Sequence, residues 1–159
     1  MPHSVLRAAY RLAYFVLSIA WWLRGRAPGG VKCVILRGDE VLLVRHTYGP
    51  KRWDLPGGAR HRGEEPAAAA RREVREELGA DLPDWTALGP LEMQLGRADV
   101  TLRPFVTRVE ALEPQRDDVE IAEARFFPLA ALPAPLGRDV PRILERAARR
   151  ASEDSETDY

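Results

Sequence analysis

The stretch Gly58–Ala80 reads GARHRGEEPAAAARREVREELGA and is the part of the sequence that decides the fold. Near its end, Glu73, Glu76 and Glu77 are spaced at i, i+3 and i+4. On an α-helix, this spacing places three carboxylates on one face. Like charges at this spacing repel, whereas a divalent cation such as Mg²⁺ binds carboxylate oxygens together with substrate phosphates. The stretch therefore predicts a helix that holds a metal ion.

A glycine-rich segment, Leu55-Pro56-Gly57-Gly58, leads into this helix. Glycine has no Cβ atom, so two successive glycines let the backbone approach a ligand closely. A carboxylate-bearing helix beside such a loop can hold one or more Mg²⁺ or Mn²⁺ ions, which bridge the oxygens of a diphosphate. The two features together favour chemistry on a phosphorylated compound.

The same residues resemble the signature of the Nudix hydrolases, G-x5-E-x7-R-E-U-x-E-E-x-G-U, in which U is a bulky apolar residue. The seven fixed positions are filled by Gly58, Glu64, Arg72, Glu73, Glu76, Glu77 and Gly79. Val74 occupies the first U position, and Ala80, at the last, is smaller than the pattern prefers. Seven fixed types at ordinary usage match by chance roughly once in 10⁸ registers. The resemblance implies an α/β/α sandwich with a mixed sheet.

The resemblance also implies a function. It is that of a metal-dependent hydrolase, which cleaves the diphosphate link of a nucleoside diphosphate joined to another moiety through attack of water at phosphorus. The cofactor would be Mg²⁺ or Mn²⁺. Two alternatives stay open: a membrane-proximal hydrolase of lipid-linked diphosphates, and a catalytically silent nucleotide-binding or scaffold module. Retention of Glu73, Glu76 and Glu77 argues against the silent module.

The resemblance assigns roles to individual residues of the signature. The implied metal ligands are Glu73, Glu76, Glu77 and the backbone carbonyl of Gly58 or of its neighbour Gly57. Glu73 is either a ligand or a base, and Arg72 would orient it. Glu64 is expected to brace the loop through an ion pair rather than to touch the metal.

Further site residues are expected outside the signature. The first candidate for an additional catalytic base is Glu120, and behind it stand Glu123, Asp117 and Asp118. Arg45 and Arg60 are the predicted phosphate-binding residues, because guanidinium groups bind phosphate oxygens. Trp53 is predicted to stack on a ring of the substrate, although it could equally pack beneath the glycine loop.

Apolar runs and turn residues predict the remaining elements. Two strands, 31–37 and 41–46, flank the hairpin signal Gly38-Asp39. The signature helix should begin near Pro66 and end at Gly79, since proline suits a first helical position and glycine a C-cap. A second antiparallel pair is expected at 85–95 and 100–109, a strand at 121–127 and a closing helix at 139–150.

Length and composition limit the remaining interpretations. The chain of 159 residues suits one domain, expected at residues 28–150, and its 24 basic and 24 acidic side chains give no overall charge for specific nucleic-acid binding. The last nine residues, 151–159, contain four acids and no base, which predicts a disordered acidic tail. Cys33 is the single cysteine, so the chain gives no sign of an oxidising compartment, and a cytoplasmic location is expected.

The N-terminal segment, residues 1–27, is predicted to be an apolar helix followed by a linker. Leu12–Leu23 reads LAYFVLSIAWWL and carries no charge. A bilayer-spanning helix needs about 20 apolar residues, so this run is short. We expect the helix, Ser4–Leu23, to pack on the domain or in a homodimer interface, because its faces are mostly apolar. Attachment to a membrane surface through Trp21, Trp22 and nearby arginines is the alternative.

Deletion of residues 1–26 tests this interpretation. The truncated protein is expected to lose solubility or to dissociate from a dimer, measured by light scattering, because an apolar contact surface is removed. The membrane alternative predicts instead that the full-length protein floats with anionic liposomes and the truncated protein does not. Flotation of a full-length protein that is monomeric without detergent would contradict the packing interpretation.

Overall fold

The computed structural model describes residues 29–95, 97–116 and 118–157, together with Val5, Leu6, Ala9 and Ala13. The predicted N-terminal helix, Ser4–Leu23, lies outside the described residues except at these four positions. In the part of the chain that is described, no helix is long and apolar enough to cross a membrane.

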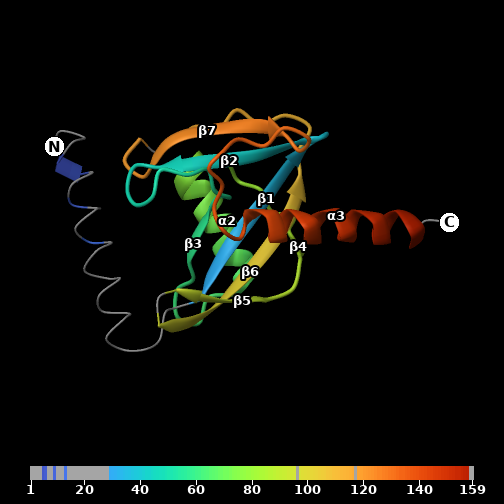
Figure 1. Cartoon of the computed structure of the whole chain (residues 1–159), viewed down its shortest axis with the longest axis horizontal. Helices are drawn as coiled ribbons and strands as arrows, with labels where there is room; N and C mark the ends of the chain where they lie inside the picture. Colours follow the sequence, from blue (N-terminus) through green and yellow to red (C-terminus); the bar gives the residue numbers. More distant parts are fainter. Residues whose placement is uncertain are drawn as a thin grey trace.

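One mixed sheet forms the centre of the domain (Figure 1). Its described strands are β1 (Gly30–Arg37), β2 (Glu40–His46), β3 (Gly57–Ala59), β4 (Thr86–Ala87), β5 (Leu91–Leu95), β6 (Ala98–Arg108) and β7 (Ile121–Pro128). The order is β4-β6-β1-β2-β7, with β3 paired to β1 and β5 paired to β6. Strands β1 and β6 run parallel, and the other described pairs are antiparallel.

The predicted strands are largely confirmed. β1 and β2 form a hairpin that turns at Gly38, whose φ of 58° is one that glycine adopts without strain. β5 and β6 form the second predicted pair. The run predicted at 85–95 is nevertheless divided into β4 and β5, because Gly89 has a φ of 81° and Pro90 follows it. Proline has no N–H for a strand ladder, so the break has a local cause.

Two helices cover opposite faces of the sheet, which confirms the expected α/β/α layers. They are α2 (Pro66–Leu78) and α3 (Val140–Thr157). Side chains alternate along a strand, so β1 supplies both faces. Val31, Cys33 and Ile35 pack with the α2 residues Ala69, Ala70, Val74 and Leu78. Val34 and Leu36 pack with the α3 residues Val140, Ile143 and Ala147.

The signature helix, α2, has the predicted ends. Pro66 lies in its first turn, and Gly79 ends it in the left-handed conformation, with a φ of 66°. The Gly79 N–H donates to the Arg75 carbonyl at 3.0 Å. Glycine adopts this conformation without the steric penalty of a Cβ, and its N–H satisfies a carbonyl that the helix itself leaves unpaired.

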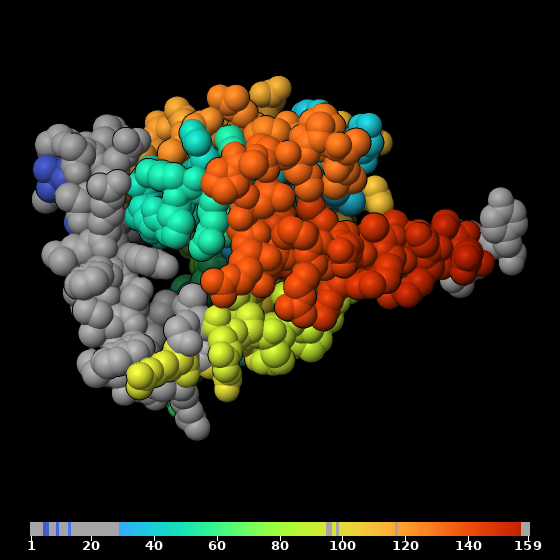
Figure 2. Space-filling model, in the orientation of Figure 1, coloured from blue at the N-terminus to red at the C-terminus, as the bar shows by residue number. Residues whose placement is uncertain are grey.

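The C-terminal helix, α3, is longer than predicted. It runs to Thr157, so the expectation that the acidic tail is disordered is wrong for residues 151–157. The helix is supported locally by an ion pair between Arg150 and Asp154 (3.2 Å) at i, i+4 spacing and by a hydrogen bond from Ser152 to Ala148 O (3.2 Å). Figure 2 shows that its second half projects beyond the body of the domain.

Ile143→Ala tests whether α3 is an integral layer of the fold. Ile143 is fully buried against the sheet. Removing its side chain should lower the free energy of unfolding by about 2–5 kcal/mol, as measured by urea denaturation. Arg142→Ala, an exposed change on the same helix, is the control and should alter stability by less than about 0.5 kcal/mol. Equal effects of the two substitutions would mean that α3 does not pack as described.

Candidate active site

Two glycines let β3 lie between β1 and α2. Gly57 has a φ of 149°, and a Cβ atom there would lie 2.1 Å from the carbonyl oxygen of Val31. A Cβ atom on Gly58 would lie 2.6 Å from Oε1 of Glu73. Both distances are shorter than any real carbon contact. The glycines therefore allow a close approach of the backbone to β1 and to the Glu73 carboxylate of α2, whereas the predicted approach to a ligand stays a prediction.

Glu77 is the most deeply buried acid of the site, with 2% of its surface exposed. One of its carboxylate oxygens accepts a hydrogen bond of 3.1 Å from the Gly57 N–H. Burial raises the pKa of Glu77 well above its ordinary value, and the charge of Glu73 raises it further. The Gly57 hydrogen bond and the charge of Lys32 act in the opposite direction.

Glu73 is also buried, one helical turn before Glu77, with 8% of its surface exposed. Burial raises its pKa, while the hydrogen bond from Arg72 lowers it and the charges of Glu76 and Glu120 raise it. Two buried carboxylates on one helix face are costly unless a cation compensates them. The need for positive charge beside two buried carboxylates is the main physical feature of the site.

Arg72 supplies part of the compensating charge. Its guanidinium group donates to Glu64 through two hydrogen bonds of 2.8 and 3.0 Å, to Glu73 at 2.9 Å and to Glu76 at 3.2 Å. It also donates to the Ala59 carbonyl at 3.0 Å. This network ties α2 to the end of β3. These are the contacts through which Arg72 would orient Glu73 and Glu64 would brace the loop, and both roles stay predictions.

Glu64 is held by the loop as well as by the helix. Its carboxylate accepts a hydrogen bond of 2.9 Å from the His61 N–H in addition to the two from Arg72. The Arg72 hydrogen bonds lower the pKa of Glu64 to about 2. Glu64 is therefore ionised under all ordinary conditions and serves as a fixed anchor for the arginine.

The three signature glutamates are not drawn together around one point. Among the described residues, no group of three His, Cys, Asp or Glu side chains is close enough to hold a metal ion as it stands. Arg72 holds Glu73 and Glu76, and the Gly57 N–H holds Glu77. The donor set nevertheless fits a hard divalent cation, because all its atoms are carboxylate or carbonyl oxygens and two of the acids are buried, of which Arg72 compensates only Glu73 directly.

The strand register indicates which glycine carbonyl faces the acids. Cys33 N–H donates to the Pro56 carbonyl at 2.8 Å, and Val31 pairs with Gly58. The backbone N–H and C=O groups of successive residues point to opposite sides of a strand, so those of Gly58, like the Pro56 carbonyl, point toward β1. The backbone groups of Gly57 point away from β1, and its N–H donates to Glu77. Of the two carbonyls considered, that of Gly57 is therefore better directed than that of Gly58.

Glu120 is the loop acid whose charge reaches the site. It contributes to raising the pKa values of both Glu73 and Glu77. Glu123, the second candidate, is engaged in ion pairs with Arg45 and with Arg125. Asp118 forms an ion pair with Arg116 at 3.0 Å, and Asp117 lies outside the described residues.

A cavity of about 220 Å³ opens beside the glycine loop. Gly57 contributes to its wall, and so do Lys32, His46, Tyr48, Gly49, Pro50, Arg52 and Asp54. Lys32 forms an ion pair of 2.9 Å with Asp54. The sequence analysis missed both residues. The available signal was Lys32 itself, a charged residue inside an otherwise apolar strand.

His46 gives the cavity an uncharged imidazole. Burial, together with the charge of Lys32, lowers the pKa of His46 to about 4. Its Nδ1 atom is buried and has no hydrogen-bond partner within the described part of the chain. The imidazole is thus neutral near pH 7 and presents an unsatisfied polar atom beside the cavity.

The three predicted substrate-binding residues are not gathered at this cavity. Trp53 is only 7% exposed and packs in the core under α3, where it meets the ring of Phe127 at a centroid distance of 4.7 Å. The prediction that Trp53 stacks on substrate is therefore wrong. Arg45 pairs with Glu123 and lies 5.0 Å above the Trp53 ring. Arg60 lines a different cavity, of about 230 Å³.

Comparison with known proteins gives the family. The profile of the NUDIX domain matches residues 27–147. The matched region covers the whole sheet, α2 and the first half of α3. The chain belongs to the NUDIX domain family.

Several proteins of known name are similar to this chain. Human diphosphoinositol polyphosphate phosphohydrolase 3-beta is 42% identical over 89 residues, which is 56% of this chain and 54% of that protein. The chain thus spans about half the length of the curated relatives it matches. A MutT NUDIX hydrolase from Burkholderia pseudomallei has a TM-score of 0.67 at 27% identity and covers 75% of this chain and 96% of its own.

A third similarity concerns the fold alone. The NUDIX domain of Shewanella oneidensis NrtR, solved in complex with ADP ribose, has a TM-score of 0.70 at 22% identity. The alignment covers 79% of this chain and 90% of that domain. The sheet with its two covering helices is therefore an arrangement shared with solved structures.

Arg72→Ala tests the ion-pair network through Glu64. Because Arg72 depresses the pKa of Glu64 to about 2, its loss should return that pKa toward 4.5, as measured by NMR titration of the carboxyl carbon. A depressed pKa stabilises the folded state above pH 4.5, and this stabilisation is lost as the pH falls toward 2. Acid unfolding of the variant should therefore begin at higher pH. Arg75→Ala, on the exposed side of α2, should leave the Glu64 pKa unchanged.

Proposed function

We propose that this protein is a metal-dependent pyrophosphohydrolase that cleaves the P–O–P link of a phosphorylated small molecule. The observation that carries the proposal is the pair of buried carboxylates, Glu73 and Glu77, held against the Gly57-Gly58 backbone of a NUDIX domain. Membership in the family, whose hydrolases use divalent metal ions, supports a cation at this place. Relatives that are named phosphohydrolases support the reaction class.

The residues would divide the work as follows. Glu73, Glu76 and Glu77, with a glycine carbonyl, would hold Mg²⁺ or Mn²⁺, and Gly57 is the better directed of the two carbonyls considered. When bound, the cation supplies charge neutralisation for the diphosphate oxygens and activates water for in-line attack at phosphorus. Arg72 would keep its ion pair with Glu73 and hold it in place. Glu76 would leave its ion pair with Arg72 and bind the metal instead.

Glu120 is the proposed general base. Its charge contributes to raising the pKa values of both Glu73 and Glu77, which supports a position on the same side of the site. A base must lie within hydrogen-bond reach of the water that it deprotonates, directly or through one further water molecule. Glu120→Gln should therefore be among the variants in any activity assay.

For the substrate, we propose a nucleoside diphosphate joined to another moiety, such as a nucleotide sugar. The cavity beside the glycine loop offers Lys32 and Arg52 for phosphate oxygens and Tyr48 for a ring. A second candidate is an inositol pyrophosphate, favoured by the 42% identity to a human protein named for that activity. A panel that contains ADP-ribose, a uridine diphosphate sugar and a diphosphoinositol polyphosphate, assayed for released phosphate products, separates the two.

The cellular location and the assembly of the protein are also proposals. The charge balance and the single cysteine support a cytoplasmic protein that does not bind nucleic acid specifically. The apolar N-terminal run supports assembly as a homodimer, with contact to a membrane surface as the alternative.

Glu77→Gln tests the metal site. Turnover of the active substrate should fall by about two or more orders of magnitude, because an oxygen ligand of the cation is weakened. Folding should be retained, since an amide matches the carboxylate in shape. Glu65→Gln is the matched control, because Glu65 is exposed at the start of α2 and makes no side-chain cap. Wild-type activity that persists in excess EDTA would refute metal dependence.

Isotope labelling tests which bond is broken. Hydrolysis in ¹⁸O-water should place the label on a phosphate product, detected by mass spectrometry, because water attacks phosphorus. Label found only on the sugar, inositol or base product would exclude the proposed chemistry. The position of the label on one phosphate product or the other identifies which phosphorus atom is attacked.

A further inference from the structure

Lys32 and Asp54 form an ion pair in the wall of the cavity beside the glycine loop. The Lys32 Nζ atom lies 2.9 Å from Oδ1 of Asp54, and only 20% of the Lys32 side chain and 24% of the Asp54 side chain is exposed. Removing two charges from water offsets much of their mutual attraction, so the pair adds little to the stability of the fold. A role in the cavity is therefore the better explanation of its position.

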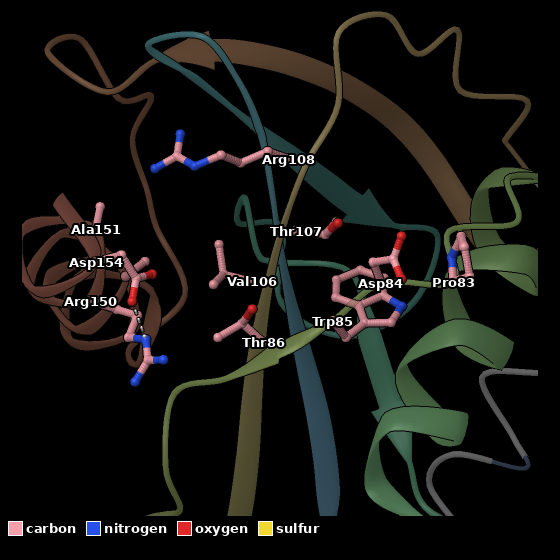
Figure 3. A pocket seen from close by; sticks show the side chains of 11 residues that line it. Pro83, Asp84, Trp85, Thr86, Val106, Thr107, Arg108, Arg150, Ala151 and Asp154 are labelled. Atoms are coloured by element: carbon pink, nitrogen blue, oxygen red, sulfur yellow. Dashed lines mark ion pairs between the residues drawn. The ribbon is translucent and has the colours of Figure 1, made fainter. Parts of the chain in front are cut away.

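A larger hollow, of about 610 Å³, has no comparable pair of groups directed at its centre (Figure 3). Arg150 is paired with Asp154 on the α3 side of this hollow, and Trp85 lies beyond β4 and β6 on the other side. Its charged and aromatic side chains therefore do not meet at one ligand. The Lys32–Asp54 pair, by contrast, is a direct contact between two residues that line one cavity.

Asp54 is held in place from three directions. Its N–H donates to the Val44 carbonyl at 2.9 Å, and its carbonyl accepts from the Val44 N–H at 2.8 Å. Its Oδ1 atom also accepts a hydrogen bond of 2.8 Å from the Leu55 N–H. Gly137 packs against the carboxyl group, since a Cβ atom there would lie 2.9 Å from Cγ of Asp54. The carboxylate is therefore a fixed point that can hold the end of a flexible lysine.

Lys32 keeps donors for a ligand and lies close to the acids of α2. An ammonium group has three N–H donors, and Asp54 is its only ion-pair partner among the described residues. In the β1–β3 ladder, Lys32 pairs with Gly57, whose N–H donates to Glu77. The charge of Lys32 opposes the rise in the pKa of Glu77 and contributes to the low pKa of His46. The remaining donors are thus available to a phosphate that extends from Glu77 into the cavity.

We propose that Asp54 is a positioning residue that holds the Lys32 ammonium for a phosphate oxygen of the substrate. This inference rests on the proposed function and adds two consequences to it. Tying the end of a flexible side chain to a fixed carboxylate orders it before the substrate arrives. The charge of Asp54 also offsets that of Lys32, so the pair attracts free anions less strongly than a lone ammonium would.

Two variants of similar shape separate the position of Lys32 from its charge. Asp54→Asn should lower kcat for the active diphosphate substrate by about tenfold or more, because the ammonium is no longer held. KM should stay the same or fall, because the cavity becomes more positive. Lys32→Met keeps the apolar stem and should raise KM by about tenfold or more, since the unpaired Asp54 carboxylate then repels phosphate.

Glu40→Gln is the matched control for both variants. It breaks an ion pair of 2.8 Å with Arg37 at the turn of the β1–β2 hairpin, outside the cavity, and it should change neither kcat nor KM. Thermal unfolding of each variant shows whether it is folded under the assay conditions. An Asp54→Asn variant with the kcat of the wild type would overturn the positioning role.

Binding of α,β-methylene-ADP in the presence of Mg²⁺ tests the pair without hydrolysis, because the bridging carbon of this analogue is not cleaved. In isothermal titration calorimetry of the full-length protein, Lys32→Met should weaken binding by about tenfold or more, and Asp54→Asn should not weaken it. The double variant should bind the analogue more tightly than Lys32→Met does, because the repelling carboxylate is gone.

The outcomes distinguish this inference from the proposed function. Binding that depends on Lys32, in a protein that hydrolyses no diphosphate, would overturn the hydrolase function and leave the pair in place. Hydrolysis that Lys32→Met leaves unchanged would overturn the pair and leave the hydrolase function in place. An Asp54→Asn variant that loses binding as strongly as Lys32→Met would reduce Asp54 to a support of the fold. Undetectable binding of the analogue at millimolar concentration would also overturn the pair.

Discussion

The absence of side chains at Gly57 and Gly58 is the constraint on which the site depends. A methyl group at Gly57 would meet the β1 backbone, and one at Gly58 would meet the carboxylate of Glu73. Without these two glycines, β3 could not lie between β1 and α2. The Gly57 N–H would then not reach Glu77, and Ala59 would not be placed to accept from Arg72. The backbone of these three residues thus contacts Glu77 and Arg72 directly and lies against Glu73.

Electrostatics in the site follows from the packing of α2. The residues that bury the helix against the sheet, Val74 and Leu78 among them, alternate with Glu73 and Glu77, so packing carries the acids inward as well. Arg72 compensates one of them directly, and Glu64 fixes Arg72 in turn. Glu77 receives only a neutral hydrogen bond and the more distant charge of Lys32. This imbalance favours a cation close to Glu77.

The features that were predicted correctly from sequence are those set by local chemistry. Gly38 specifies the β1–β2 turn, and Pro66 and Gly79 specify the ends of α2. The error at Trp53 concerns contacts between residues distant in sequence. Nothing near Trp53 in the sequence indicates that Phe127 and α3 enclose its ring.

The cavity beside the glycine loop illustrates the same limit. Lys32 and Asp54 are 22 positions apart in the sequence and meet because the segment before β3 is held against β1 and β2: Asp54 exchanges two backbone hydrogen bonds with Val44, and the Pro56 carbonyl accepts one from Cys33. The alternation of apolar residues in β1 predicts a buried strand, but it does not say which strands will flank it. The end of α3 was misplaced for a different reason. Its acidic composition resembles that of disordered tails, whereas the ion pair with Arg150 supports a helix.

β1 contributes side chains to both hydrophobic layers, and this has a consequence for how the domain opens. Val31 and Ile35 belong to the layer under α2, and Val34 and Leu36 belong to the layer under α3. Neither helix can separate from the sheet without exposing one side of the same strand. Native-state hydrogen exchange should therefore find the slowest amides in β1, where exchange requires cooperative global unfolding rather than local fluctuation. The strand that frames the glycine loop would then be the most persistent part of the domain.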